Sequence, residues 1–252
     1  MDKKIALITG GNRGLGKNAA LKLASKGFDV ILTFRSHKAE ADAVAAEIRN
    51  AGGKAAALPL DTSQVATFAA FAGQVKSELQ KNWQRNTFDC LVNNAGIGIN
   101  APFAETTEAQ FDLLMNIHLK GVFFLTQSLL PLMPDGGRIL NVSSGLTRFS
   151  IPGFAAYASM KGAVEVLTRY LAKELGKRGI AVNVIAPGAI ATDFGGGAVR
   201  DNKELNAFIA SQTALGRAGE PDDIGGVIAS LLSEECRWIN AQRIEASGGM
   251  FI

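Results

Sequence analysis

The stretch that decides the fold is residues 5–16, which read IALITGGNRGLG. Its first five residues, Ile5 to Thr9, are apolar or β-branched and predict a buried strand. A glycine-rich turn follows at once, and apolar residues then recur three and four positions apart from Gly14 to Lys26, as they do in a helix. Strand, turn and helix in direct succession place backbone N–H groups and the positive end of the helix where a phosphate can bind.

The same alternation continues along the rest of the chain. Apolar, β-branched runs predict further strands at residues 30–34, 55–60, 90–92, 138–142, 181–186 and 243–245. Periodic patterns predict further helices at residues 39–50, 64–81, 108–133 and 155–178. This alternation implies right-handed crossovers and a parallel sheet covered on both faces, so we expect an α/β, doubly wound Rossmann fold. No polar or proline-rich linker divides the 252 residues, which favours a single domain over residues 1–252.

The composition narrows the classes of function. The 26 basic and 23 acidic residues are dispersed and give a net charge of +3, without the dense basic stripe that nucleic-acid binding needs. Cys90 and Cys236 lie outside any Cys-x-x-Cys or Cys/His pattern, so we expect neither a disulfide framework nor a metal site. The chain has no signal-peptide pattern and no apolar run of about 20 residues. We therefore expect a soluble, cytoplasmic protein with no nucleic-acid or membrane partner.

The end of the second predicted strand indicates which dinucleotide is bound. In a doubly wound sheet, ligands bind beyond the carboxyl ends of the strands, so the first turn predicts a dinucleotide site with the pyrophosphate against its glycines. NAD would need an acidic residue at the end of the second strand, but that strand ends Phe34-Arg35-Ser36. Arg35, with Ser36 and with Arg13 from the turn, suits a 2′-phosphate instead, although either arginine alone could be a solvated surface charge. The sequence predicts NADPH/NADP⁺ as the cofactor.

A second group of residues points to proton transfer. Tyr157 and Lys161 are four residues apart on a predicted helix, so they share one face. A nearby cation favours the phenolate of a tyrosine, which lets the phenol exchange a proton with a substrate oxygen at neutral pH. This spacing arises by chance in many helices, but here Ser143-Ser144 and the turn 93–96 follow strands of the same predicted sheet. Together these residues predict an oxidoreductase that transfers hydride.

On these residues the whole chain resembles the short-chain dehydrogenase/reductase family. The match comprises Thr9-Gly-x-x-x-Gly14-x-Gly16, Asn93-Asn-Ala-Gly96, Asn116, Ser144, Tyr157-x-x-x-Lys161 and Pro187-Gly188 with Thr192, in the family's order. The resemblance implies a seven-stranded parallel sheet, usually a homotetramer, and a catalytic tetrad of Asn116, Ser144, Tyr157 and Lys161. It makes Tyr157 the acid/base and Ser144 the group that holds the substrate oxygen, while Lys161 contacts the nicotinamide ribose. Asn116 would hold a water in a proton relay, unless it is an ordinary polar helix position.

The same resemblance assigns further contacts to the cofactor. Asp61 would meet the adenine, and it could also cap the helix that follows. Ile190 and Thr192 would meet the nicotinamide carboxamide. In all, we expect the cofactor to be bound by Gly10, Asn12, Arg13, Gly14, Leu15, Gly16, Arg35, Ser36, Asp61, Thr62, Asn93, Ala95, Gly96, Tyr157, Lys161, Pro187, Gly188, Ile190 and Thr192.

The surroundings expected for the reacting carbonyl are apolar, which favours an alkyl, aryl or acyl ketone. They comprise Ile97, Leu146, Phe149, Ile151, Phe154 and Phe194. The run 195–197, three glycines, suggests the edge of a mobile lid. Arg148 is expected to be a surface charge, and His37 and His118 to be structural or surface residues.

Three functions fit these patterns. We expect an NADPH-dependent oxidoreductase that reversibly reduces a ketone or aldehyde to an alcohol. One alternative is a 3-oxoacyl-[acyl-carrier-protein] reductase, for which Lys173, Lys177 and Arg178 would offer a basic docking face. Another is a non-catalytic NADPH-sensing regulatory protein, against which the intact tetrad argues. The stretch 245–249 reads EASGG where the family often has Asp-Gly-Gly, a departure that bears on subunit interfaces rather than on chemistry.

Overall fold

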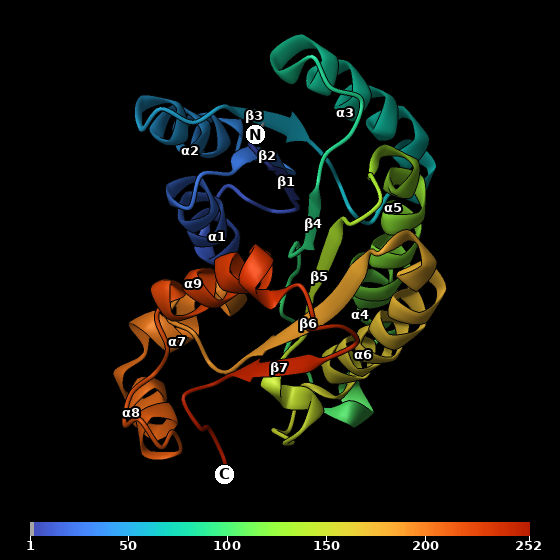
Figure 1. Ribbon diagram of the computed structural model, residues 1–252. Coiled ribbons are helices and arrows are strands. Elements are labelled where there is room, and N and C mark those ends of the chain that lie inside the picture. Colours follow the sequence, from blue (N-terminus) through green and yellow to red (C-terminus); the bar gives the residue numbers. More distant parts are fainter. Residues whose placement is uncertain (1–2) are drawn as a thin grey trace.

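The computed structural model describes residues 3–252 and contains one seven-stranded parallel sheet (Figure 1). Its order is β3-β2-β1-β4-β5-β6-β7, with every neighbouring pair parallel. The strands are β1 (Ile5–Ile8), β2 (Asp29–Phe34), β3 (Ala55–Pro59), β4 (Cys90–Asn93), β5 (Arg138–Val142), β6 (Ala181–Pro187) and β7 (Arg243–Ala246). The strand order reverses between β1 and β4, so the carboxyl ends of these two strands flank a crevice. The predicted α/β doubly wound fold is confirmed.

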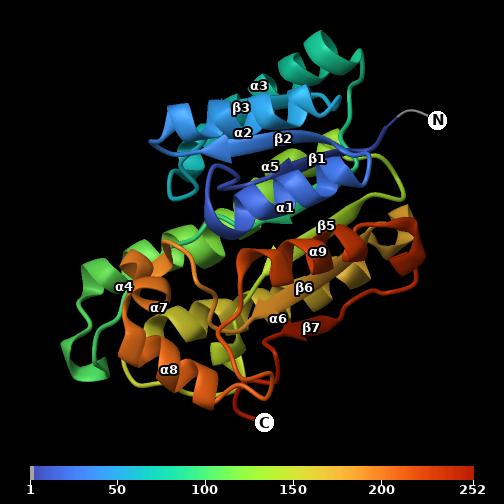
Figure 2. The ribbon, with the colours of Figure 1, turned by 90° about the vertical axis from the view of Figure 1, so that its left-hand side faces the viewer.

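Helices cover both faces of the sheet. Helices α1, α2 and α9 pack on one face, and α3, α5 and α6 pack on the other (Figures 1 and 2). The helices are α1 (Gly14–Ser25), α2 (Lys38–Asn50), α3 (Phe68–Trp83), α4 (Glu108–Met115), α5 (Gly121–Leu129), α6 (Ala155–Leu175), α7 (Ala198–Asp201), α8 (Lys203–Ser211) and α9 (Pro221–Leu231). Short 3₁₀ turns lie at Val65–Thr67, Phe103–Glu105, Leu130–Leu132, Gly145–Thr147, Gly176–Arg178, Phe194–Gly197 and Glu234–Cys236.

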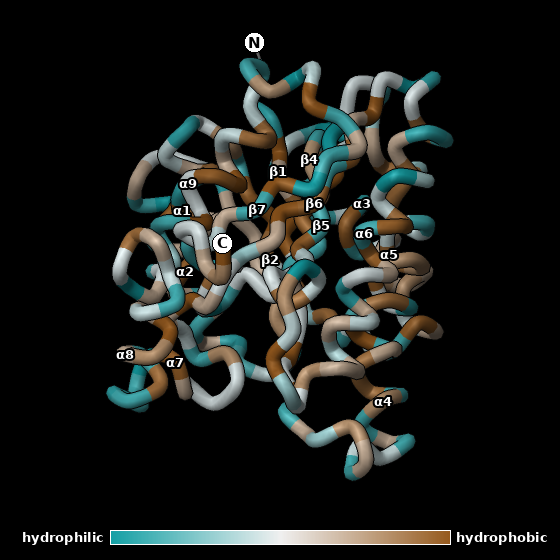
Figure 3. The backbone as a smooth tube through the Cα atoms, turned by 90° about the horizontal axis from the view of Figure 1, so that it is seen from below, coloured by the Kyte–Doolittle hydropathy of each residue, from teal (hydrophilic) through white to brown (hydrophobic). Residues whose placement is uncertain are grey.

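The core consists of two apolar layers separated by the sheet. Side chains of β1 alternate between them: Ile8 packs with α1 and α9, whereas Leu7 packs with α3 and α5. Strands β1, β2, β4 and β5 are buried along their whole length, as expected for a parallel sheet that has helices on both faces. Figure 3 accordingly shows the hydrophobic residues concentrated in the strands at the centre and the hydrophilic residues in the outer loops.

The helix predicted over residues 108–133 is not continuous. A π-helical turn, Asn116–Lys120, separates α4 from α5, and the last turn, Leu130–Leu132, is 3₁₀. The three helices α7, α8 and α9 were not predicted. The segment 108–132 is also long and apolar enough, by length and composition, to cross a membrane, and 44% of an apolar 18-residue window within it is buried in this fold. That finding corrects the expectation that no such apolar run exists.

Candidate active site

A cavity of about 430 Å³ lies at the carboxyl ends of the strands, where the strand order reverses. It runs from the turn after β1 and the end of β2 to Tyr157 and the segment around α8. Most residues predicted to bind the cofactor line it, namely Gly10, Asn12, Arg13, Gly14, Leu15, Gly16, Arg35, Ser36, Asp61, Thr62, Ala95, Gly96, Tyr157, Lys161, Pro187, Gly188, Ile190 and Thr192. Asn93, predicted to bind the cofactor, and Asn116, predicted as a catalytic residue, do not line the cavity.

The glycine turn has a shape that only residues without Cβ permit. Gly10 adopts φ +65°, and a Cβ on Gly16 would lie 2.1 Å from the carbonyl oxygen of Gly10. The side chain of Asn94, which sequence reasoning did not single out, donates to the carbonyls of Thr9 and Gly10 and fixes the turn against β4. The start of α1 therefore faces the cavity with free backbone N–H groups, an arrangement that fits a pyrophosphate.

Two arginines border one end of the cavity. Arg13 and Arg35 are both exposed there, and neither forms an ion pair with any carboxylate of residues 3–252. Ser36 lies beside them and shares a hydrogen bond of 3.0 Å with Nδ1 of His37, a residue that also lines the cavity and was expected only as a structural or surface residue. The site offers two guanidinium groups and a hydroxyl, the donors that suit a phosphate monoester.

Tyr157, Ser144 and Lys161 meet at the other end of the cavity. Tyr157 and Ser144, which follows β5, both line the cavity, and Ser144 lies close enough to the phenol to lower its pKa. Lys161, one turn further along α6, is buried, and its Nζ lies 5.6 Å from the centre of the Tyr157 ring. Its ammonium donates a 2.7 Å hydrogen bond to the carbonyl of Val142. The structure thus brings together three of the four predicted tetrad residues around one point.

Burial dominates the electrostatics of this group. It raises the pKa of Tyr157 above its ordinary value, and the nearby hydroxyl of Ser144 only partly opposes the rise. Burial also lowers the pKa of Lys161, to about 7, and its ammonium donates to the carbonyl of Val142. Burial therefore has the largest effect on the phenol in the ligand-free protein, and the effect of Lys161 on the phenolate stays a prediction.

Asn116 begins the π-helical turn between α4 and α5. Its carbonyl accepts from the backbone N–H of Gly121, five residues on, instead of from the fourth residue as in an α-helix. Such single π turns are frequent at functional sites, since they re-aim the residues that they contain. Asn116 is partly exposed but lies outside the cavity lining, so the structure places it near the site without bringing it to Tyr157.

His118 is the residue at this site that sequence reasoning undervalued. Its imidazole is fully buried, and its ring meets that of Tyr157 edge-on at 5.1 Å between centroids. Nε2 lies 2.8 Å from the carbonyl of Ile97, while Nδ1 is buried without a hydrogen-bond partner in residues 3–252. Burial and the charge of Lys161 hold the pKa of His118 well below its ordinary value. Its neutral ring packs against Gly96, where a Cβ would lie 2.7 Å from the ring.

Asn93 has a structural position instead of the predicted one at the cofactor. Its amide donates to the hydroxyl of Thr126 at 3.0 Å and to the side-chain oxygen of Asn141 at 2.8 Å. The amide of Asn141 in turn donates to Thr168 on α6. These four buried side chains join β4 and β5 to α5 and α6, and none of them lines the cavity.

The remaining wall of the cavity is apolar. All six residues predicted around the carbonyl line it, and so do five that were not predicted: Val199, Leu205, Phe208, Ile209 and Met250. Aromatic rings surround Tyr157, with Phe194 at 5.9 Å and Phe154 at 6.5 Å between centroids. The three glycines 195–197 have φ between +61° and +81°, conformations that glycine adopts readily, and they connect Phe194 to α7. The site therefore pairs a proton donor with an apolar chamber.

Comparison with known proteins agrees with this geometry. A family model described as enoyl-(acyl carrier protein) reductase matches residues 10–251. The chain belongs to the short-chain dehydrogenase/reductase family. It is 36% identical over 252 residues to the 3-oxoacyl-[acyl-carrier-protein] reductase FabG of Staphylococcus aureus, covering 99% of this chain and 98% of that protein.

Two solved structures of this short-chain dehydrogenase/reductase fold are also similar to the chain. LugOII, described as a promiscuous reductase that catalyses keto-reduction at C1 in lugdunomycin biosynthesis, has a TM-score of 0.94 at 37% identity, over 99% of this chain and 98% of that one. The angucycline C-6 ketoreductase LanV, solved with bound NADP, has a TM-score of 0.93 at 35% identity, over 98% and 95% of the two chains. All three relatives are reductases.

Proposed function

We propose that the protein is an NADPH-dependent reductase that converts a ketone with bulky apolar substituents to an alcohol, reversibly. The observation that carries this proposal is a cavity lined by the glycine turn at one end and by an apolar, aromatic chamber at the other, with the neutral phenol of Tyr157 and the hydroxyl of Ser144 between them. Such a cavity holds a dinucleotide at one end and a carbonyl compound at the other. The similarity to LugOII and LanV, both ketoreductases, supports the same class of reaction.

The residues at the glycine turn and at the end of β2 fit NADPH. The turn would hold the pyrophosphate, and Arg13, Arg35 and Ser36 would hold the 2′-phosphate, since no carboxylate stands where NAD would need one. The cofactor supplies the hydride. LanV, which is similar to this chain, was solved with bound NADP.

The proton is supplied by the protein's own residues. Burial keeps Tyr157 protonated, so its phenol donates a proton to the carbonyl oxygen of the substrate. The hydroxyl of Ser144 holds that oxygen by a second hydrogen bond, which strengthens as negative charge develops on it. Lys161 stands behind Tyr157 and would contact the ribose, and Asn116 would hold a water that leads to Lys161.

The second candidate is reduction of a 3-oxoacyl group on an acyl-carrier protein, which the similarity to FabG favours. The basic face considered for docking does not suit it. Arg178 is bonded to Asp135 and to the carbonyls of Leu130 and Met133, and it follows α6 at the amino-terminal edge of the sheet. About 30 Å of helix separates it from Tyr157, at the opposite edge. Reduction of a free ketone is therefore preferred.

The protein is also proposed to be a cytoplasmic homotetramer. Helices α5 and α6 present a row of exposed apolar side chains, among them Phe123, Val166 and Tyr170, on a face that no other element covers. Exposed apolar patches of this kind mark surfaces that bind protein. In this proposal the apolar stretch 108–132 belongs to the core of the protein and contributes through α5 to the subunit interface.

Absorbance of NADPH at 340 nm tests the proposed function directly. The panel contains 2-tetralone, a β-keto ester, an acyl thioester and no substrate, each with NADPH and with NADH. We expect turnover with 2-tetralone and a preference for NADPH that Arg35→Ala reduces by raising the KM for NADPH. Tyr157→Phe should abolish turnover and leave NADPH binding unchanged. Preference for the thioester would favour the carrier-protein reductase, and binding of NADPH without any turnover would favour a sensor.

A further inference from the structure

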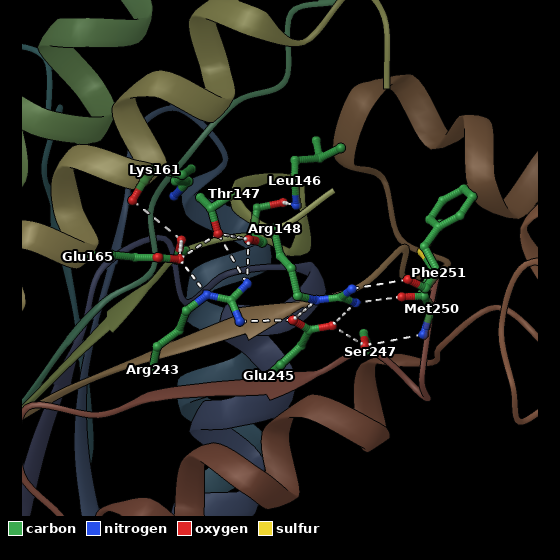
Figure 4. Close-up of polar contacts among 12 residues, drawn as sticks. Leu146, Thr147, Arg148, Lys161, Glu165, Arg243, Glu245, Ser247, Met250 and Phe251 are labelled. Carbon is green, nitrogen blue, oxygen red and sulfur yellow. Dashed lines mark hydrogen bonds and ion pairs between the residues drawn. The ribbon is translucent and has the colours of Figure 1, made fainter. Parts of the chain in front are cut away.

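The loop that carries Ser144 is attached to the C-terminal tail by Arg148. The guanidinium of Arg148 donates to both carboxylate oxygens of Glu245, at 2.8 and 2.6 Å, and to the carbonyls of Met250 and Phe251, at 2.6 and 3.1 Å (Figure 4). Glu245 also accepts from the hydroxyl of Ser247. Arg148 therefore holds β7 and the far end of the tail 247–251, which follows β7, and Glu245 holds the start of that tail. Arg148 is exposed, as expected of a surface charge, but it is ion-paired with Glu245.

A second arginine on β7 attaches the same loop to α6. Arg243 donates to Glu165 at 2.9 Å, to Glu245 at 2.8 Å, and to the hydroxyl of Thr147 at 3.1 Å. The same oxygen of Glu165 accepts from the hydroxyls of Ser143 and Thr147, both at 2.7 Å. Ser143 and Thr147, which flank residues 144–146 in the chain, are thus fixed to Glu165, one turn beyond Lys161 on the helix that carries Tyr157.

The four charged side chains balance one another. Two guanidinium groups face two carboxylates, and bidentate pairs such as Arg148–Glu245 fix orientation as well as distance. None of the four lines the cavity, so they do not present charge to an apolar substrate. Their role must therefore be exerted through the segments that they hold.

The tail held by Arg148 is a wall of the substrate chamber. Met250 is buried and lines the cavity, and Phe251 packs on Phe149 at 4.9 Å and near Phe208 at 6.5 Å between centroids. Three backbone hydrogen bonds join the tail to residues 212–215, and Met250 packs with Ile209 and Ala218. The hydrogen bonds of Arg148 to two tail carbonyls add a direct attachment between this wall and the loop that carries Ser144.

We propose that Arg148 and Glu245 are positioning residues that set the specificity of the enzyme for bulky ketones, by holding the tail 247–251 against the chamber. The inference rests on the proposed function. The network has two halves: Arg148 and Glu245 hold the tail, and Glu165 and Arg243 hold the loop that carries Ser144. Substitutions in the two halves should therefore have different effects on catalysis. Loss of Arg148 affects substrates that reach the tail, whereas loss of the Glu165 anchor affects every substrate, because all of them use Ser144.

Steady-state kinetics with two ketones separates these effects. The ketones are 2-tetralone, whose two rings fill the chamber, and butanone, which reaches only Tyr157 and Ser144. Arg148→Ala should raise the KM for 2-tetralone about tenfold, with kcat and the constants for butanone changed less than about twofold. Arg148→Lys, which keeps the charge but loses the bidentate fork, should give an intermediate KM. Glu165→Gln should instead lower kcat for both ketones.

Arg85→Ala is the matched control. Arg85 also forms a bidentate pair, with Asp89, and donates to one backbone carbonyl, but it precedes β4 at the edge of the sheet opposite the cavity. Its loss should lower the melting temperature and leave both KM values unchanged. If Arg148→Ala raised the KM for both ketones equally, or if Arg85→Ala raised the KM for 2-tetralone as much, the inference would be overturned and the proposed function would stand. A wild-type protein that oxidises NADPH with neither ketone would overturn the proposed function, and the inference with it.

Discussion

Lys161 makes the stability of the cofactor-free protein depend on pH in a way that can be calculated. Burial lowers its pKa to about 7, from an ordinary value of 10.5 in the unfolded chain. Between these two values the unfolded chain binds more protons than the folded one, so the free energy of unfolding rises with pH. Below about pH 7 both states are protonated and the full cost of the buried charge is present. The cost is relieved as pH rises through the folded-state pKa.

The expected size follows from the same two pKa values. From about pH 7 to about pH 8.5, one group with these pKa values adds about 1.5 kcal/mol to the free energy of unfolding. For a chain of 252 residues this raises the melting temperature by about 3 to 6 °C. His118 contributes little in this range because its pKa lies well below 6.5 in the folded protein, and Cys90, raised to about 12 from 9.0, matters only above it.

Lys161→Met isolates the effect, because methionine has a similar length and no charge. Thermal or urea unfolding of both proteins without cofactor, at several pH values over this range, should show a rising profile for the wild type and a flat one for the variant. The variant also leaves the carbonyl of Val142 without its partner, but that loss is the same at every pH. Parallel profiles for the two proteins would refute the assignment of the pH dependence to Lys161.

Three further outcomes are expected. Gly16→Ala should weaken NADPH binding at least about tenfold in a fluorescence titration, because the new Cβ would lie 2.1 Å from the carbonyl oxygen of Gly10. Gly73→Ala is the control: Gly73 lies within α3 with nothing within 4 Å of its Cβ, so this variant should stabilise the protein by about 0.5 to 1 kcal/mol. Asn141→Ala should cost about 2 to 4 kcal/mol in urea unfolding, since it removes two buried hydrogen bonds and leaves a cavity, and a cost below about 1 kcal/mol would contradict this. The hydrogen bond from Arg148 is the main cause that lowers the pKa of Glu245 from 4.5 to about 2, so Glu245 stabilises the fold above about pH 4.5 and loses this effect as pH falls toward 2. Glu245→Gln should lack this loss when the free energy of unfolding is measured between about pH 4.5 and about pH 2. The same decrease in stability in wild type and variant would contradict the prediction.

The sequence predicted the sheet and the edge at which ligands bind because both depend on local patterns. A buried parallel strand is an uninterrupted apolar run, and the polar residue after it marks the carboxyl end. Helix α9 was missed although its signals are present, with Pro221 in the first turn and a capping box formed by Glu220 and Asp223. Helix α7, with four residues between a glycine run and Asn202, has too short a pattern to detect.

Other features depend on contacts that spacing does not encode. Asn93 lies at the carboxyl end of a strand, as predicted. That position fixes the edge of the sheet and not the face, and the side chain points to Thr126 and Asn141. The π turn at Asn116 adds a residue to one turn, so a helical period of 3.6 misplaces the side chains beyond Asn116, including His118. The raised pKa of Tyr157 arises from burial, which four-residue spacing to a lysine does not reveal.

The two serines at the end of β5 show how one chain combines fixed chemistry with adjustable specificity. Because successive side chains of an extended segment point in opposite directions, Ser144 faces Tyr157 while Ser143 faces Glu165 and its network. The reacting oxygen is therefore held by one residue, and its neighbour connects that position to charges outside the cavity. Substitutions in the Arg148–Glu245 half of the network can move the apolar wall without touching Ser144, Tyr157 or Lys161. Altered charges behind the loop therefore offer a way to change the substrate of this enzyme while the proton transfer stays the same.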